Sequence, residues 1–220
     1  MKYNDRRDAA LKLMPYLEKY KNEQVVILAV PRGGVPIGYY ISKRYNFPLD
    51  LLMTKKIGYP NNPEFAIGAV SLEDFIVDEK INVPKTYINE NIKQIRNNLE
   101  KRYHLFMGNR KPNDLRNKTV IIVDDGIATG NTILSSIKML RKKKVKKIVV
   151  AVPVSPPESA NFIKKEVDDF ICPYLPEIFV GVGLHYIDFS EVTDEEVIRF
   201  LNDSNHFEKN RSVKLLNELS

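Results

Sequence analysis

The sequence predicts an α/β protein with a central, mostly parallel β-sheet flanked by helices. Three apolar runs rich in β-branched residues, Val25–Val30, Thr119–Val123 and Val145–Val152, have the composition of strands that are buried on both faces. Segments with an apolar residue at every third or fourth position lie between these runs, as in amphipathic helices. Strands that alternate with helices form βαβ units, and such units build parallel sheets.

The remaining elements follow in chain order. A helix over Asp5–Tyr20, with a kink at Pro15, precedes the first strand, and a helix over Val35–Tyr45 follows it. Ile88–Phe106 forms a long helix, because its apolar residues recur at intervals of three or four. We also predict strands at Leu49–Thr54, Ala66–Leu72, Phe75–Val77 and Asp169–Cys172, helices at Gly130–Arg141 and Pro156–Glu166, and loops at Lys55–Phe65 and Gly108–Lys118.

Composition limits the class of protein. The chain has 220 residues, a net charge of +6, 43% hydrophobic residues and one cysteine, Cys172. These values are typical of a globular protein of one or two domains, and they exclude an intramolecular disulfide. The N-terminal residues carry charges where a signal peptide has its apolar core, and no apolar run is long enough to span a bilayer. We therefore expect a cytoplasmic protein without a membrane partner, whose positive charge suits a small anion or a nucleic acid.

The stretch Val120–Thr132 joins an apolar strand to a helix through two carboxylates and several small or hydroxyl-bearing residues. Asp124 and Asp125 fall at the carboxyl end of the strand, where open α/β sheets bind ligands. Gly126–Thr132 then enters a helix N-terminus, whose unpaired N–H groups favour an anion such as phosphate. The carboxylates would repel that anion, so we expect them to bind ribose hydroxyls. The alternative is an ordinary strand-to-helix turn with an N-cap.

This stretch resembles the signature by which type I phosphoribosyltransferases bind phosphoribosyl pyrophosphate (PRPP). The resemblance implies that Asp124 and Asp125 hold the ribose 2′- and 3′-hydroxyls. It also implies that Mg²⁺ joins ribose and pyrophosphate oxygens, and that these two aspartates contact the metal only indirectly, through ribose or water. The 5′-phosphate would be bound by Gly126, Ile127, Ala128, Thr129, Gly130, Asn131 and Thr132.

A second anion site is predicted at Val30–Pro36, after the first strand. Gly33 and Gly34 allow a ligand to approach the backbone closely, and Arg32 carries a planar guanidinium that suits phosphate. A tight turn with an exposed arginine is the alternative. Type I phosphoribosyltransferases have their pyrophosphate loop at this position. The resemblance therefore implies that Arg32 and the two glycines bind the PRPP pyrophosphate, and it predicts a cis peptide bond at Pro31–Arg32.

The segment Lys55–Phe65 contains glycine, two prolines and two lysines, which predicts a flexible lid loop that closes over PRPP and excludes water. A solvated surface loop is the alternative. Lys55 and Lys56 would reach the pyrophosphate, and Glu64 is a candidate proton acceptor. Residues 55–70 also resemble a bacterial and archaeal group of phosphoribosyltransferases without an established acceptor. That similarity extends to about residue 202, so we expect one domain over residues 1–202 and a tail or appended helix over residues 203–220.

Residues 169–186 resemble the hood of hypoxanthine-guanine phosphoribosyltransferases, which covers the acceptor base. The resemblance implies that Phe179 or Val180 stacks on the acceptor, and it places His185 where those enzymes have an acid that orders the metal. Core packing of Phe179 and a purely structural His185 are the alternatives. Ala128 stands where those enzymes have an aspartate that handles the purine proton. This leaves Glu64 or a substrate-assisted route for proton transfer.

Together these motifs predict a glycosyltransferase of nucleotide metabolism. It would transfer the phosphoribosyl group of Mg-PRPP to a nitrogen acceptor, a purine-like base as in purine salvage, and release pyrophosphate. The catalytic candidates are Arg32, Lys56, Glu64, Asp124 and Asp125. The alternative is a non-catalytic regulatory protein that senses PRPP or a nucleotide, which the basic run Arg141–Lys147 and Ala128 favour. We expect small-molecule partners rather than nucleic acid, and the family resemblance suggests a homodimer.

Overall fold

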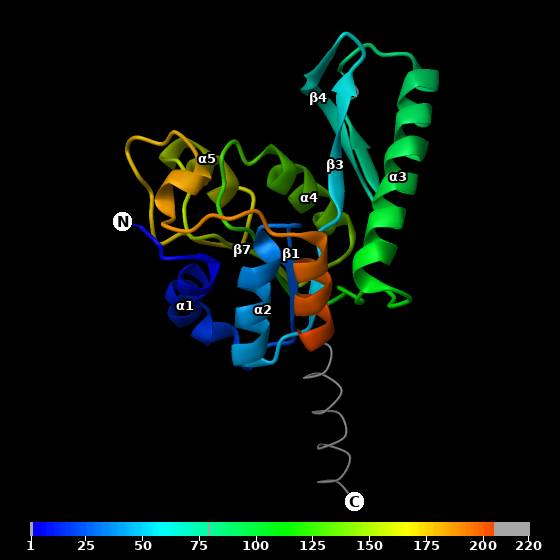
Figure 1. Cartoon of the computed structure of the whole chain (residues 1–220). Coiled ribbons are helices and arrows are strands. Elements are labelled where there is room, and N and C mark those ends of the chain that lie inside the picture. Colours follow the sequence, from blue (N-terminus) through cyan, green and yellow to red (C-terminus); the bar gives the residue numbers. More distant parts are fainter. Residues whose placement is uncertain (1, 79, 205–220) are drawn as a thin grey trace, which may run out of the picture.

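The central sheet of the computed structural model, which describes residues 2–78 and 80–204, has five strands, all parallel (Figure 1). Their order is β2-β1-β6-β7-β8, so the chain starts in the middle of the sheet and builds outward on both sides. The predicted α/β architecture is confirmed. The strands are β1 (Val25–Ala29), β2 (Leu49–Leu51), β6 (Thr119–Val123), β7 (Lys147–Ala151) and β8 (Asp169–Ile171).

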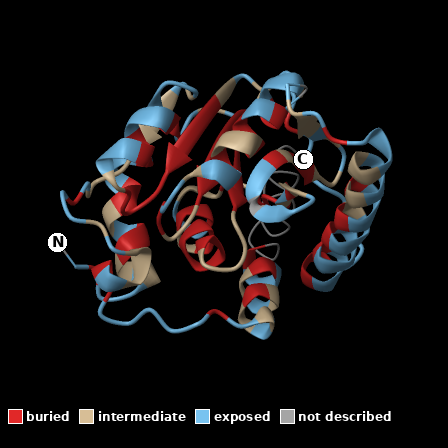
Figure 2. Ribbon diagram, turned by 90° about the horizontal axis from the view of Figure 1, so that it is seen from above, coloured by how far each residue is buried: buried red, intermediate tan, exposed pale blue. Residues whose placement is uncertain are grey.

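Helices cover both faces of this sheet, because its strands have apolar side chains on both faces. Helices α1 (Arg6–Leu17) and α2 (Gly34–Tyr45) pack in the core on one face, together with a helix at residues 194–204. Helices α4 (Asn131–Lys142) and α5 (Pro157–Lys164) pack in a second core on the other face. Figure 2 shows the strands as buried, whereas the surrounding helices are buried along one side and exposed along the other.

A second, antiparallel sheet stands beside α3 (Lys85–Met107) at one end of the molecule (Figure 1). Its strands are β3 (Thr54–Tyr59), β4 (Asn62–Ser71) and β5 (Phe75–Val77). The prediction of an irregular loop at Lys55–Phe65 is therefore wrong, because most of that segment lies in a β-hairpin.

Local packing explains the hairpin. Ile57 on β3 and Ile67 on β4 are almost completely buried, so each strand contributes an apolar side chain to the core. Gly58 and its neighbour Tyr59 lie at shifts in the pairing register. A side chain at Gly58 would clash with the backbone of Pro63 on the opposite strand. Gly58 and Pro63 are part of the sequence pattern that predicts a loop. In the structure they lie close together where the pairing of the hairpin is irregular.

The residues before α1 pair with the segment around His185. Tyr3 donates its N–H to the His185 carbonyl oxygen (2.8 Å) and accepts a hydrogen bond from the Ile187 N–H (2.8 Å). His185 ends a short 3-10 turn, η2 (Val182–His185); another, η1 (Glu18–Tyr20), follows α1. The helix at 194–204 continues past the predicted boundary at residue 202, and residues 205–220 of the predicted tail lie outside the described part. No helix within the described residues has the length and apolar character needed to cross a membrane.

Candidate functional site

The two predicted anion loops leave neighbouring strands at the same edge of the sheet. β1 and β6 are paired in parallel, with Ala29 opposite Val123. The Val30 N–H donates to the Val123 carbonyl oxygen at 2.9 Å, just where both strands end. Two segments separated by more than ninety residues in sequence therefore begin side by side.

The glycines of the first loop allow direct contact with the second. A Cβ on Gly33 would lie 1.9 Å from the Asp125 Oδ2, and one on Gly34 would lie 2.5 Å from the Val123 carbonyl oxygen. Neither distance is possible for a real side chain, so only glycine allows the loops to approach this closely. The Pro31–Arg32 peptide bond is cis, as predicted.

The second loop is anchored in its first half and exposed in its second. The buried Ile127 donates its N–H to the Val154 carbonyl oxygen (2.9 Å), and the Ala128 carbonyl oxygen accepts a hydrogen bond from Ser159 (2.7 Å). Gly130 then adopts a φ of 74° at the start of α4 and supplies no side-chain cap. Thr129, Asn131 and Thr132 are exposed. The N-terminus of α4 can therefore offer N–H groups and hydroxyls to an anion.

The acidic pair lies between the two loops. Asp124 accepts the Asp125 N–H at 2.8 Å, and Asp125 forms an ion pair with Arg6 of α1 (2.9 Å). Burial raises the pKa of the Asp124 carboxyl well above its usual range, and the neighbouring Asp125 raises it further. Burial also raises the pKa of the Asp125 carboxyl, and the Arg6 guanidinium partly offsets this. The site thus holds two neighbouring carboxyl groups whose charged forms are disfavoured by burial, and such perturbed groups are typical of functional sites.

The hood segment packs against this loop. The Tyr186 hydroxyl donates to the Asp125 carbonyl oxygen at 2.6 Å, and Val182 fills the space beside Gly126. His185 stacks on the Phe179 ring, with 5.4 Å between ring centroids and 19° between planes. Burial, followed by charges that include Lys2, lowers the pKa of His185, and its Nε2 has no hydrogen-bond partner among the described residues.

The sequence from residue 7 to residue 187 matches the model of the phosphoribosyl transferase domain. Two loops that meet at the carboxyl ends of adjacent parallel strands agree with that match. The chain belongs to the type I phosphoribosyltransferase family.

Similar proteins support this assignment. A protein of Mycobacterium tuberculosis described as a phosphoribosyl transferase is 33% identical over 206 residues, which is 91% of this chain. The chain spans about half the length of that relative (46%). The crystal structure of a Thermus thermophilus protein superimposes with a TM-score of 0.84 at 32% identity, covering 91% of this chain and 98% of the other.

Other predicted site residues lie in the hood and in the second sheet. Val180 is 78% exposed in the hood. Lys55 and Lys56 have exposed side chains on β3, in the second sheet. Glu64 belongs to β4, but its side chain lies outside the described part of the structure.

A pair of hydrogen bonds joins the hairpin to the phosphate loop. The Ser136 hydroxyl lies 3.0 Å from the Thr54 hydroxyl, at the root of the hairpin, and 2.8 Å from the Thr132 carbonyl oxygen. Ser136 is on α4, which begins at the phosphate loop, and Thr54 directly precedes Lys55. The two predicted lysines are therefore connected to the loop through α4.

Arg32 contacts residues that the sequence did not indicate. Its guanidinium forms ion pairs with Glu191 and with Asp194 (3.4 Å), in the segment that follows the hood. Arg102 of α3 lies 3.5 Å from the same Asp194. The predicted pyrophosphate-binding arginine is thus paired with acids. An incoming pyrophosphate would have to compete with those acids or displace them.

The donor set suits Mg²⁺ in the indirect role expected from the family. Asp124 and Asp125 offer carboxylate oxygens, the ligands that this hard cation prefers. No three His, Cys, Asp or Glu side chains form a metal-binding cluster within residues 2–78 and 80–204. Two carboxylates supply only part of the octahedral shell of Mg²⁺, so this pair fits a metal that takes its remaining ligands from substrate and water.

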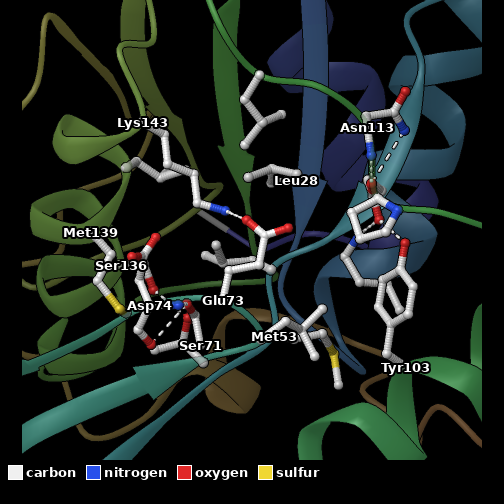
Figure 3. Close-up of a pocket in the computed structure, with 18 of the residues that line it drawn as sticks. Leu28, Met53, Ser71, Glu73, Asp74, Tyr103, Asn113, Ser136, Met139 and Lys143 are labelled. Atoms are coloured by element: carbon white, nitrogen blue, oxygen red, sulfur yellow. Dashed lines mark hydrogen bonds and ion pairs between the residues drawn. The ribbon is translucent and has the colours of Figure 1, made fainter. Parts of the chain in front are cut away.

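A cavity of about 440 Å³ lies away from this site, between β2, the hairpin root and the second half of α4 (Figure 3). The residues that line it include none of the predicted PRPP contacts. Its charged groups largely pair with one another. Lys143 meets Glu73, and on the other side Asp50 accepts hydrogen bonds from Asn113 and Tyr103. This hollow is accordingly distinct from the candidate site.

The basic run Arg141–Lys147 is also partly neutralised. Arg141 forms an ion pair with Asp168 (2.8 Å). Glu23 forms an ion pair with Lys147 (2.8 Å) and lies 3.6 Å from Lys146. These pairs reduce the positive potential that a nucleic acid would need.

Proposed function

We propose that residues 1–202 form a phosphoribosyltransferase domain that binds Mg-PRPP and transfers its phosphoribosyl group to a nitrogen acceptor. The observation that carries this proposal is the contact between the two loops, where Gly33 lies against Asp125. The loop after β1 offers the Arg32 cation and allows a ligand to approach its backbone closely. The loop after β6 offers the two carboxylates, followed by the N-terminus of α4. A ligand with a diphosphate, a sugar diol and a second phosphate matches that sequence of groups.

Each group has a role in the proposed reaction. The bond between C1 and the pyrophosphate oxygen breaks as the bond from C1 to the acceptor nitrogen forms, through an oxocarbenium-like transition state. Arg32 and Lys56 would stabilise the leaving pyrophosphate, with Lys55 beside them, and Asp124 and Asp125 would hold the ribose hydroxyls. Such fixed charges lower the barrier because they need no reorganisation during the reaction. Residues Gly126–Thr132 would bind the 5′-phosphate.

Two further components complete the proposal. Mg²⁺, when bound, would neutralise negative charge on the pyrophosphate and so make it a better leaving group. The acceptor nitrogen must lose its proton, and Glu64 or an oxygen of the substrate would accept it. Closure of the hairpin over the site would keep water from attacking C1.

The acceptor is proposed to be a purine-like base, as in purine salvage, held under the hood near Phe179, Val180 and His185. The stacked pair of Phe179 and His185 shows that this segment accommodates parallel aromatic rings. An acceptor ring could continue such a stack. A cytoplasmic homodimer is the form that we propose for the protein.

Pyrophosphate release tests the function directly. The full chain is supplied with PRPP, Mg²⁺ and a panel of purine and pyrimidine bases, and pyrophosphate is measured over time. We expect release that depends on one base. PRPP binding without base-dependent release would instead support the regulatory alternative, in which the protein senses PRPP.

A further inference from the structure

Arg6 lies one residue before the segment that matches the family, yet it reaches the candidate site. Its Nε and Nη2 lie 3.0 Å and 2.9 Å from the Asp125 Oδ2. Its Nη1 donates to the Ser190 carbonyl oxygen at 2.8 Å, so all three guanidinium nitrogens are bonded. The side chains of Arg6 and Asp125 are only 12% and 14% exposed, which places this ion pair in a partly dry environment.

Aromatic residues hold Arg6 from the other side. The guanidinium carbon lies 4.1 Å from the centre of the Phe189 ring, within the range of a cation–π contact. The Phe189 ring packs on Tyr186 with 5.0 Å between centroids, and the Tyr186 hydroxyl donates to the Asp125 carbonyl oxygen. Asp125 is therefore held at its carboxylate by Arg6 and at its backbone by Tyr186. One partner comes from α1 and the other from the hood, and neither belongs to the phosphate loop.

The bonds from Arg6 concentrate on one oxygen of the Asp125 carboxylate. Both arginine nitrogens meet the same atom, Oδ2, so Arg6 does not use the Asp125 Oδ1. Two adjacent carboxylates repel each other, and a buried carboxylate without a cation would move toward a partner or take up a proton. A fixed guanidinium opposes both, because it offsets part of the charge and constrains the rotamer.

We propose that Arg6 is a positioning residue, which holds Asp125 so that its second oxygen meets the ribose hydroxyls of PRPP. This inference rests on the proposed function. Arg6 would affect binding of the ribose and not binding of the pyrophosphate, because the pyrophosphate would bind to the separate loop around Arg32. Arg6 touches no reacting atom and acts only through Asp125.

Calorimetric titration of two ligands separates this role from a general loss of structure. The probes are PRPP and inorganic pyrophosphate, both with Mg²⁺, and the variants are R6M and R6K. R6M keeps the apolar body of the side chain and removes its charge, so PRPP affinity should fall at least tenfold more than pyrophosphate affinity. R6K retains a charge without the planar fork, so its PRPP affinity should lie between those of R6M and the unsubstituted protein.

The matched control is R7M, since Arg7 is an exposed neighbour on the same helix whose guanidinium faces Tyr40. We expect R7M to bind both ligands as the unsubstituted protein does. Unchanged PRPP binding by R6M, or equal loss of both ligands, would overturn the positioning role alone. Failure of the unsubstituted protein to bind PRPP would overturn the proposed function and this inference together.

Discussion

The Asp124 carboxylate lies where the surrounding protein replaces much of its water. Burial raises its pKa, and the adjacent Asp125 carboxylate adds to the effect. The folded state therefore binds this proton more tightly than the unfolded chain does. Consequently this group lowers the free energy of unfolding as pH rises from about 4, where a free aspartate titrates, toward the folded pKa. A residue that costs stability at neutral pH is expected where a ligand needs it.

Replacing Asp124 with asparagine should separate stability from binding. D124N removes the buried charge and preserves the shape of the side chain, so at neutral pH the Tm should rise by about 2–4 °C, equivalent to about 1 kcal/mol. PRPP affinity should fall about tenfold or more, because a neutral amide accepts weaker hydrogen bonds from the ribose hydroxyls. Thermal unfolding and PRPP titration measure the two effects. Unchanged PRPP affinity would contradict the ribose role of Asp124.

His185 makes the opposite pH prediction. Its pKa is lowered by burial, so protonation is easier in the unfolded chain, and the stability that it contributes is present above about pH 6.5 and lost as pH falls. H185F keeps the stacking on Phe179 and removes both the titration and the unpartnered Nε2. Unfolding between pH 7 and pH 5 should show less loss of stability in H185F than in the unsubstituted protein. An identical pH dependence would show that other groups are responsible.

The sequence locates residues of the site where the motif is local, and misses those that arrive from elsewhere. Asp124 and Asp125 stand out because strand, acids and helix follow one another within thirteen residues. Arg6 and Glu191 do not stand out in the sequence. Arg6 is 119 residues away from its partner Asp125, and Glu191 is 159 residues away from its partner Arg32. A single charged residue has no periodicity that could reveal such a contact.

At the scale of elements, the buried strands and long helices are predicted well because their hydrophobic pattern reflects their packing. All five positions of β1 and all five of β6 are buried. Their residues form continuous apolar runs, apart from Thr119 at the start of β6. Most of β4 agrees with the strand predicted at Ala66–Leu72, but its start and nearly all of β3 are missed. Strand β3 is half exposed and carries two lysines, so its pattern is mostly polar. Its pairing depends on long-range contact with β4, which single-sequence periodicity does not record.

The segment after the hood provides a test of Arg32. Glu191 and Asp194 pair with its guanidinium and would compete with pyrophosphate for it. In E191Q one competing charge is removed, so inorganic pyrophosphate should bind about two- to fivefold more tightly, the modest gain expected for an exposed ion pair. The difference should shrink at high salt, because salt already screens the pair.

The control for this change is E195Q, which removes an exposed acid from the same segment without a contact to Arg32 in the described structure. Pyrophosphate affinity should be unaffected in E195Q. Equal gains in both variants would attribute the effect to overall charge rather than to the ion pair.

At the scale of the molecule, the two sheets differ in how well they are protected. The central sheet lies between two apolar cores, and its inner strands are buried (Figure 2). The second sheet is covered less well. Phe65 on β4 and Phe75 on β5 are about half exposed (51% and 47%), and Lys55 and Lys56 face solvent. Regions with fewer buried contacts open at lower free energy than the core.

Hydrogen exchange should therefore resolve two levels of stability. Without ligand, amides of β1, β6 and β7 should exchange only through global unfolding, whereas amides near the hairpin tip of β3 and β4 should exchange at least tenfold faster through local opening. Mg-PRPP should slow the hairpin amides more than its global stabilisation slows those of the core, because closure over the ligand adds contacts there. If hairpin and core amides respond equally to PRPP, the hairpin does not close over the site. In that case the exclusion of water must come from the hood, which already packs on the phosphate loop through Val182 and Tyr186.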